Sequence, residues 1–326
     1  MSGDIATMQT VRVGVIGAGG IAKQHLDVIR EMPGIEAVAI ASRTRSKAEA
    51  LASAYDIPCV SNDLPSMVRQ GKLDALMVLV SVEQMYTVTL AAAAYRLPLF
   101  VEKPAGALPL QNQELAVLAT ERGIPTMVGF NRRYYSIFQK GIDIIREHGP
   151  ILGVAVEGHE RMWRVREGGK FSSFELDHWL FGNSVHTIDL LRFFGGDVSR
   201  IHTIVHRRFG EAHGDQFSAV MELASGAIGQ YSAHWYSPGG WRVALYGDGV
   251  TVEFTPLEKG VWVDKNFQTH AIMPDEVDVN YKPGFYRQMD AFRILVRDGV
   301  SPWPAQDLGG SYKTMQLAEA MAGPFV

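Results

Sequence analysis

A glycine-rich segment early in the chain has residue types and a spacing suited to binding phosphate. The segment Gly17-Ala18-Gly19-Gly20-Ile21-Ala22 has the form G-x-G-x-x-A and lies between an apolar run at 11–16 and a helical pattern at 21–31. In this context the first glycine permits a tight turn, the second lets the backbone approach a pyrophosphate, and the small alanine lets helix and strand pack closely. A glycine-rich turn that binds nothing is the alternative, but the position after the first strand favours dinucleotide binding. The predicted phosphate-binding residues are Gly17, Gly19, Gly20, Ile21 and Ala22.

The end of the second predicted strand indicates which dinucleotide is bound. An NAD site usually offers Asp or Glu to the ribose hydroxyls there, whereas this chain has Ala41-Ser42-Arg43-Thr44-Arg45 and no carboxylate. Arg43 is suited to stack on an adenine and pair with a 2′-phosphate, and Ser42 and Arg45 offer further hydrogen bonds. The sequence therefore favours NADP, with NAD as the alternative.

A lysine follows another apolar strand candidate. The segment Leu99-Phe100-Val101-Glu102-Lys103-Pro104 places Lys103 at the carboxyl end of a predicted parallel strand, where open α/β sheets bind ligands. Partial desolvation near a positive nicotinamide ring would lower the pKa of the ammonium and fit it to orient a hydroxyl or carry a proton. An exposed loop lysine is the alternative.

The elements that must position these residues alternate in the first part of the chain. Strand candidates and helical patterns follow one another, which predicts a doubly wound parallel sheet. The predicted strands are 11–16, 37–41, 75–80, 98–102 and 126–130, and the predicted helices are 21–31, 46–55, 85–95 and 111–122.

Beyond about Gly149 the pattern changes to short β-rich segments joined by glycine-bearing turns, which predicts a mostly antiparallel sheet. The predicted strands are 151–157, 201–209, 215–223, 227–234, 241–246, 251–255 and 260–263, and two late helices are predicted at 285–297 and 308–322. We expect a Rossmann domain at 1–128 and a substrate-binding and oligomerisation α/β domain at 129–326, built on a large open sheet.

Composition excludes several classes of protein. The chain has 326 residues, 47% of them hydrophobic and 20% charged, with a net charge of −4 and no basic stripe, so nucleic acid is a poor candidate partner. The single cysteine, Cys59, excludes an intrachain disulfide and a four-thiolate zinc site, and no histidine spacing suggests a metal. Without a secretory leader or an apolar stretch long enough to span a membrane, the expected location is the cytoplasm.

With these segments in view, the chain resembles the glucose-fructose oxidoreductase and inositol dehydrogenase family (Gfo/Idh/MocA) over nearly its whole length. The resemblance rests on VGVIGAGGIAKQH at 13–25, VEKP at 101–104, VGFNRRY at 128–134, HTIDLL at 186–191 followed by two glycines, and the late helix near 307–321. It implies a Rossmann domain followed by an α/β domain whose open sheet packs against a twin in dimers or tetramers. It also implies reversible hydride transfer at a secondary alcohol of a sugar, polyol or sugar acid.

Carried over to this sequence, the resemblance makes Lys103 the catalytic lysine and His186 the proton acceptor, a role that suits an imidazole with an ordinary pKa near ~6.5. Asp189, three residues on, would steady the histidine or the substrate. A histidine bonded to backbone at a helix start is the alternative for His186. The resemblance also implies cofactor contacts at Ser81, Glu102, Lys103 and Asn131, beside those at Ser42 and Arg43.

Two segments depart from the family pattern. Many relatives have D-x-G-x-H, whereas this chain has Gly182-Asn183-Ser184-Val185-His186, so Asn183 offers hydrogen bonds without negative charge. The family's Thr-Pro-Asn-x-x-His is replaced by the segment 81–86, which ends in Tyr86. The alternatives are therefore a cofactor-binding regulator or scaffold with reduced activity, and a dehydratase or glycosidase that oxidises its substrate transiently.

Softer candidates surround these residues. Arg161 or Arg164 would suit a carboxylate or phosphate, or would lie in an exposed charged loop. Asn131 and Arg132 lie near the cleft in this family. Aromatic and polar residues that would suit sugar stacking, or else the core, are His178, Trp179, His234, Trp235 and Tyr236.

Overall fold

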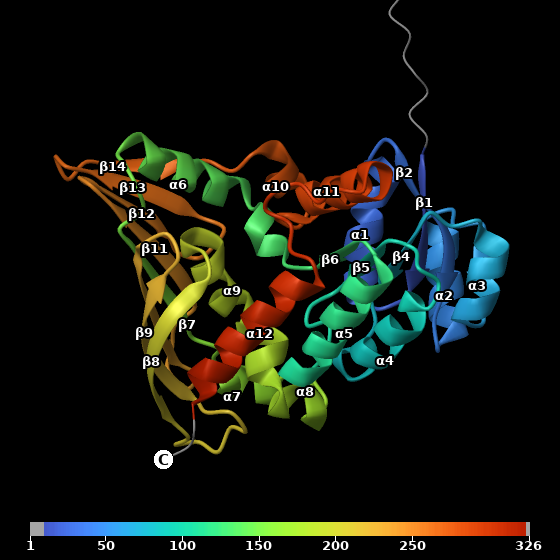
Figure 1. Cartoon of the computed structure of the whole chain (residues 1–326), viewed down its shortest axis with the longest axis horizontal. Coiled ribbons are helices and arrows are strands. Elements are labelled where there is room, and N and C mark those ends of the chain that lie inside the picture. The colour runs from blue at the N-terminus through green and yellow to red at the C-terminus, as the bar shows by residue number, and fades with distance from the viewer. Residues whose placement is uncertain (1–9, 324–326) are drawn as a thin grey trace, which may run out of the picture.

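The computed structural model describes residues 10–323, which form two β-sheets with helices between and around them. Figure 1 shows the N-terminal sheet and its helices on the right, the large second sheet on the left, and α9 and α12 between them.

The first sheet has six strands in the order β3-β2-β1-β4-β5-β6, and all of its pairs are parallel. The sheet order reverses between β1 and β4, and at such a point the carboxyl ends of open parallel strands leave a crevice for a ligand. The strands are β1 (Val11–Ile16), β2 (Ile35–Ala41), β3 (Cys59–Ser61), β4 (Ala75–Val78), β5 (Leu99–Val101) and β6 (Thr126–Val128).

Five helices connect these strands. They are α1 (Gly20–Glu31), α2 (Arg45–Ala54), α3 (Leu64–Gly71), α4 (Val82–Ala93) and α5 (Pro109–Arg122). The strands β4, β5 and β6 end earlier than predicted, at Val78, Val101 and Val128. The three-residue strand β3 and the helix α3 were not predicted, because so short an edge strand carries too little of a hydrophobic pattern to be recognised.

The second sheet has eight strands in the order β14-β13-β12-β11-β7-β10-β9-β8. The described pairs are antiparallel except that of β7 with β10. Burial alternates along β9, so one face of the sheet is covered and the other is open. The strands are β7 (Gly153–Gly158), β8 (Val198–His206), β9 (Gln216–Leu223), β10 (Ile228–His234), β11 (Trp241–Gly247), β12 (Val250–Phe254), β13 (Gly260–Asp264) and β14 (Thr269–Ile272).

The remaining helices cover the inner face of this sheet or join the two units. They are η1 (Asn131–Tyr134), α6 (Ser136–Glu147), α7 (Met162–Glu167), α8 (Ser173–Asp177), the π-helical turn η2 (Leu180–Ser184), α9 (Val185–Gly195), α10 (Glu276–Asn280), α11 (Phe285–Asp298) and α12 (Leu308–Ala322). The two late helices agree closely with their predicted bounds. Across the described residues, no helix is both long enough and apolar enough to cross a membrane.

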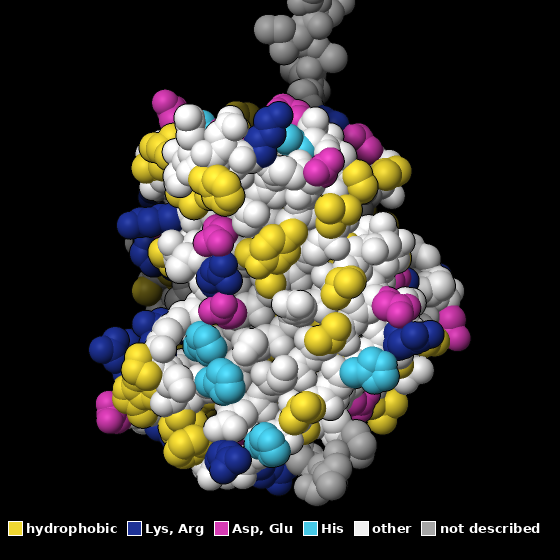
Figure 2. All heavy atoms as spheres, turned by 90° about the vertical axis from the view of Figure 1, so that its left-hand side faces the viewer, with side chains coloured by type: hydrophobic (Ala, Val, Ile, Leu, Met, Phe, Trp, Pro, Cys, Tyr) yellow, Lys and Arg dark blue, Asp and Glu magenta, His cyan; other side chains and the backbone are white. Residues whose placement is uncertain are grey.

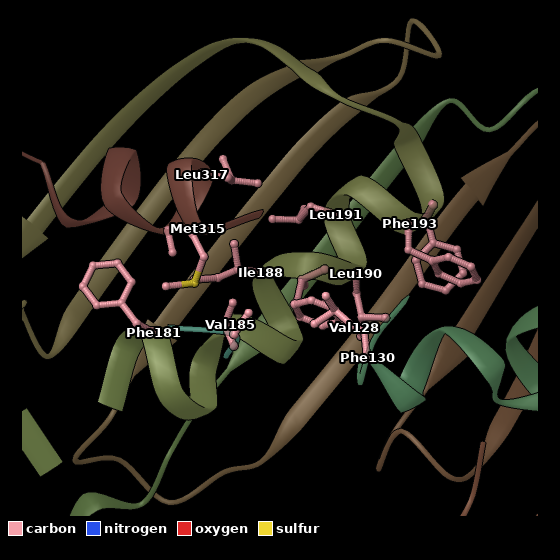
Figure 3. Packing of buried hydrophobic residues seen from close by; sticks show 14 of the residues in the cluster. Val128, Phe130, Phe181, Val185, Ile188, Leu190, Leu191, Phe193, Met315 and Leu317 are labelled. Atoms are coloured by element: carbon pink, nitrogen blue, oxygen red, sulfur yellow. The ribbon is translucent and has the colours of Figure 1, made fainter. Parts of the chain in front are cut away.

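One hydrophobic core continues from the first sheet into the second. It contains Val78, Val101 and Val128 of the parallel strands and also the buried side chains of α9 and β9. Figure 3 shows α9 in the middle of this core, with Ile188 near Met315 of α12 and Leu190 near Val128 and Phe130. Because protein interiors are closely packed and hardly compressible, this core holds the ends of the two sheets in a fixed relative position.

Helix α11 packs with the first unit although it lies in the segment 129–326. Phe285, Met289 and Phe292 share a core with the strand β1 and the helix α1. The boundary predicted at 128 coincides with the end of β6. Through α11, however, a late part of the chain packs against the first unit again. The fold class predicted from the sequence, a Rossmann sheet followed by a large, mostly antiparallel open sheet, is confirmed.

Candidate dinucleotide and substrate site

The glycine turn between β1 and α1 has the geometry that phosphate binding requires. Gly17 has a φ of +115°, and a Cβ on it would lie 2.3 Å from the Leu79 carbonyl oxygen, so no other residue fits there. A Cβ on Gly19 would meet no atom within 4 Å, so the backbone lies open on that side. No side chain caps α1, which leaves the N–H groups of its first turn and its positive dipole end for an anion.

A cavity of about 530 Å³ lies beside this turn, at the carboxyl ends of the parallel strands. Its lining includes Gly17 and Gly19 from the first turn, Ser42 and Arg43 from the end of β2, and Ser81 from the start of α4. The described residues that line it therefore include five of the sequence-predicted cofactor residues, contributed by three separate strand ends.

The end of this cavity at the carboxyl end of β2 is rich in positive charge. Arg43 and Lys47 both line it, both are exposed, and neither forms an ion pair with any described residue. Arg45, also suggested by the sequence, is engaged elsewhere, because its guanidinium donates to Glu49 and Asn62. Asp63 lines the cavity, but its carboxylate caps α3 by accepting from the Ser66 backbone N–H at 2.8 Å. Lys47 was not predicted; its place two residues after Arg45, on the first turn of α2, was the available signal.

Lys103 follows β5 and reaches across to the second unit. Its Nζ donates a hydrogen bond of 2.7 Å to the carbonyl oxygen of Gly182. Desolvation lowers the pKa of Lys103 to about 8, and the positive charges of Arg132 and Lys282 add to this effect while Glu102 opposes it. An ammonium retains three donors, so two remain after the bond to Gly182.

Glu102, predicted to contact the cofactor, holds the backbone beside Lys103. Its carboxylate is 2.9 Å from Nε2 of the fully buried His25 and accepts from the Lys103 backbone N–H at 3.0 Å. The same carboxyl group packs against Gly129, where an added Cβ would lie 2.8 Å away. Glu102 thus links α1, β5 and the end of β6.

His186 lies on the first turn of α9, directly after the π-helical turn that carries Gly182. Its side chain is buried, 5% exposed, and hydrogen-bonds to no described residue. Its ring contacts Phe130 edge-on at 6.1 Å and lies 6.2 Å from Trp241. Burial lowers its pKa well below the ordinary value, assisted by the positive charges of Arg132, Lys103 and Lys282, so the imidazole is neutral near pH 7. The alternative of a histidine bonded to backbone is not observed among residues 10–323.

A buried carboxyl group that sequence reasoning passed over lies beside this turn. Glu160, just beyond β7, accepts from Ser184 Oγ at 2.5 Å and from Asn183 Nδ2 at 2.7 Å. It is 7% exposed, and burial raises its pKa. A carboxyl group therefore lies beside this turn, although it comes from the segment after β7 and not from the D-x-G-x-H position. The signal in the sequence was that Glu160 closely follows the predicted strand 151–157. From this segment only Arg161 and Arg164 were proposed as candidates.

The structure places Asp189 away from its predicted role. Its carboxylate accepts two hydrogen bonds from Arg133, at 2.7 and 2.9 Å, and further bonds from Gln306 and Thr314, and none from His186. Asp189 is 1% exposed and Arg133 is 8% exposed. The pair ties η1, α9 and α12 together, so the position three residues after His186 serves the fold.

The other sequence candidates are dispersed. Asn131 is buried and donates to the Pro283 carbonyl oxygen at 3.0 Å, so it holds a loop and does not line the dinucleotide cavity. Arg161 and Arg164 are exposed. Tyr86 donates to Glu114 at 2.5 Å. Among the aromatic candidates, Trp179 and Trp235 are buried, Tyr236 donates to Glu211, His178 bonds to a backbone carbonyl, and His234 is exposed.

A parallel sheet of this strand order, with an uncapped helix after its first strand and a cavity at the strand ends, defines a Rossmann-type dinucleotide-binding protein. Comparison with known families gives the same class. Residues 11–130 match the model described as the oxidoreductase family with an NAD-binding Rossmann fold, and residues 155–253 match the GFO/IDH/MocA C-terminal domain. The chain belongs to the GFO/IDH/MocA family of oxidoreductases, and the resemblance noted in the sequence is confirmed.

Curated relatives share a quarter or so of their residues with the chain. The oxidoreductase YrbE of Bacillus subtilis is 27% identical over 64% of the chain and 62% of its own length, so that match spans less than two thirds of the relative. The scyllo-inositol 2-dehydrogenase (NAD(+)) of Bacillus subtilis is 24% identical over 90% of the chain and 88% of its length. The D-xylose 1-dehydrogenase (NADP(+)) 2 of Haloferax volcanii is 22% identical over 89% and 90%.

Solved structures with this fold include a dehydrogenase from Chromobacterium violaceum, with a TM-score of 0.81, 21% identity and coverage of 96% of this chain and 94% of that one. An oxidoreductase from Thermotoga maritima has a TM-score of 0.81, 18% identity and coverage of 97% and 96%. At such identities the likeness establishes the fold.

The position of Asp189 gives a prediction about stability. Asp189→Asn leaves the buried Arg133 guanidinium without its counter-charge, so we expect the free energy of unfolding to fall by about 3–5 kcal/mol. Urea unfolding followed by tryptophan fluorescence measures this change. Asp143→Asn, in an exposed pair with Arg146 at 3.7 Å, is the control and should change stability by less than about 1 kcal/mol. Unchanged stability with a large loss of activity per folded molecule would restore the catalytic role predicted from the sequence.

Proposed function

We propose that the protein transfers a hydride between a nicotinamide dinucleotide and a secondary alcohol or ketone of a sugar, polyol or sugar acid. The observation that carries the proposal is the position of Lys103 from the first unit beside the helix start that carries His186 of the second: Lys103 Nζ donates at 2.7 Å to Gly182, four residues before His186, and the charge of Lys103 acts on the imidazole. The named activities of the scyllo-inositol and D-xylose relatives support the substrate class.

The side chains divide the proton chemistry between them. When bound, the dinucleotide supplies the ring carbon that accepts the hydride of the alcohol carbon. The neutral, unbonded imidazole of His186 takes the hydroxyl proton as the carbonyl forms, and returns it in the reverse direction. Lys103 uses its remaining N–H groups to orient the same oxygen. Glu160, through Asn183 and Ser184, holds the turn that positions both groups.

This division supports an enzyme over the regulator alternative. A scaffold that had lost turnover would gain nothing from a buried lysine with a lowered pKa facing an unbonded imidazole, since both are costly to bury.

For the cofactor we propose NADP over NAD. The support is the pair of unpaired cations, Arg43 and Lys47, at the end of the cavity where β2 terminates, together with the engagement of Asp63 as a helix cap. A 2′-phosphate pairs well with such cations, whereas ribose hydroxyls would prefer a free carboxylate.

Replacing the lysine tests the proposed chemistry. Lys103→Met should lower kcat by about 10²- to 10⁴-fold on any sugar, polyol or sugar acid that the wild type oxidises, with little change in dinucleotide affinity. Absorbance of the reduced nicotinamide measures turnover, and tryptophan fluorescence measures dinucleotide binding. Equal turnover by wild type and variant would contradict the role of Lys103.

The pH dependence should follow the same two groups. The His186 base stays neutral until well below pH 6.5, and Lys103 loses its proton as pH rises through about 8. Initial rates of alcohol oxidation should therefore not depend on pH from below 6.5 to about 8. Above about pH 8, where Lys103 loses its proton, the rate should depend on pH, which forms the upper limb of the profile. Lys103→Arg should move this upper limb to higher pH. An upper limb that stays in place in Lys103→Arg would assign it to another group.

Cofactor preference has its own test. Arg43→Ala should raise the Kd of NADP by about 10- to 100-fold and that of NAD by less than about 3-fold, because only NADP loses a charge-assisted pair. Arg69→Ala, an exposed arginine on α3 outside the cavity, controls for the change in net charge. Equal weakening of both dinucleotides would refute the preference for NADP.

We further propose that a second copy of the chain covers the open face of the large sheet. Figure 2 shows this face, with hydrophobic side chains among charged groups and histidines. Its exposed apolar residues include Ile204, Val220 and Ile228, and its arginines are paired within the face, Arg200 with Glu222 and Arg242 with Glu157, so two copies would not repel.

The oligomer is tested by placing charge on this face. Val220→Glu should convert the assembly to monomers, because burying unpaired carboxylates at a self-complementary interface is unfavourable. Light scattering coupled to gel filtration measures the mass, and Val300→Glu, an exposed valine outside the sheet, is the control. A monomeric wild type at micromolar concentration would exclude this assembly.

A further inference from the structure

Three cations act on His186, and none of them forms an ion pair with a described residue. Lys103, Arg132 and Lys282 each act on the imidazole, since the positive charge of each lowers the pKa of His186. Within residues 10–323, no ion pair joins any of the three to a carboxylate. They come from three separate segments, the end of β5, η1 and the loop before α11.

Of the three cations, Arg132 has the most hydrogen-bond donors without a partner. Its guanidinium lies 4.5 Å over the ring of Trp241, whose other contact is with His186 at 6.2 Å. Its hydrogen bonds to described residues amount to a 3.3 Å bond to Asn131 Oδ1, and its Nε is buried with no partner. Arginine presents five donors in a planar fork, so most of this fork is unused.

The nearby carboxylates are already occupied. Glu102 is bonded to His25 and to the Lys103 backbone. Glu160 accepts from Asn183 and Ser184, and burial raises its pKa. Glu258 accepts from the Tyr135 hydroxyl at 3.3 Å.

Lys282 is held near Arg132 by the backbone. Asn131 donates to the Pro283 carbonyl at 3.0 Å, and Gly284, with a φ of +81°, lies so close that a Cβ would be 2.1 Å from the Asn131 carbonyl oxygen. The Lys282 ammonium lies 4.8 Å from the Phe285 ring and is exposed. Partial desolvation and the charge of Arg132 lower its pKa, as expected for two cations held close together.

Gathering like charges in a partly desolvated site is unfavourable unless an anion binds there. An oxidised nicotinamide would add one more positive charge. We propose that the substrate carries an anionic group, a carboxylate or a phosphate, which Arg132 binds through its planar fork with Lys282 at the rim. This inference rests on the proposed oxidoreductase function and narrows its substrate class from neutral sugars and polyols to sugar acids or sugar phosphates.

Matched substrates test the inference. Neutral aldoses and polyols, the corresponding uronic and aldonic acids, and the corresponding sugar phosphates are compared by initial rates with saturating dinucleotide. We expect kcat/KM for one anionic series to exceed that for its neutral counterparts by at least about 10-fold. A preference for acids identifies a carboxylate as the recognised group, and a preference for phosphates identifies a phosphate.

Variants of Arg132 separate anion binding from general damage. Arg132→Gln should raise KM for the anionic substrate by about 10- to 100-fold, with a smaller effect on kcat, and should change kcat/KM of neutral substrates by less than about 3-fold. Arg132→Lys should recover part of the affinity because it restores the charge without the fork. Arg69→Gln, with the same change in net charge at an exposed site on α3, should behave as wild type.

Each contrary result has a distinct meaning. Equal kcat/KM for neutral and anionic substrates, or equal losses for both in Arg132→Gln, would overturn the inference while leaving the proposed function intact. A higher dinucleotide Kd in Arg132→Gln, measured by fluorescence without substrate, would assign Arg132 to the cofactor and also overturn it. Turnover of no sugar, polyol, acid or phosphate, despite dinucleotide binding, would instead be a failure of the proposed function.

Discussion

The hydrogen bond from Lys103 Nζ to the Gly182 carbonyl is the contact on which the arrangement of the site depends. It joins the carboxyl end of β5 to the π-helical turn before α9 at 2.7 Å. A π-helical turn leaves carbonyl groups outside the regular helical ladder, and such turns are frequent at functional sites. The bond thereby ties the lysine of the parallel sheet to the turn that directly precedes the helix carrying His186.

Buried polar contacts on both sides keep this bond in place. On the first unit, Glu102 bonds His25 and the Lys103 backbone, and packs against Gly129. On the second, Glu160 holds Asn183 and Ser184, and the pair of Asp189 with Arg133 fixes α9 to η1 and α12. Each of these carboxylates is engaged in positioning, and none of them forms an ion pair with Lys103, Arg132 or Lys282 among the described residues. The same contacts that order the site therefore leave the cations near His186 without a paired anion.

The departure from the family pattern before His186 has a physical resolution. The chain lacks an aspartate at position 182, where the backbone carbonyl of a glycine instead accepts from Lys103. The carboxyl group comes from Glu160 on the far side of the turn, through two neutral donors. The carboxyl group thus lies just beyond β7 and not on the histidine's own helix, and burial raises its pKa.

The role proposed for His186 was implied by the resemblance to the family, whereas the sequence by itself determined the class of fold, the phosphate-binding turn and the place of Lys103 after a strand. These depend on local patterns: a glycine that must adopt a positive φ, apolar runs that alternate with helical periods, and a lysine directly after a strand. Only the tertiary structure decided that Asp189 pairs with Arg133, that Glu102 serves His25, that Glu160 reaches the turn before His186, and that Arg132 stays unpaired. The reason is that the role of a buried charged group depends on its partners, and the partners in these pairs lie from 23 to 77 positions apart in the chain, at separations that no local pattern encodes.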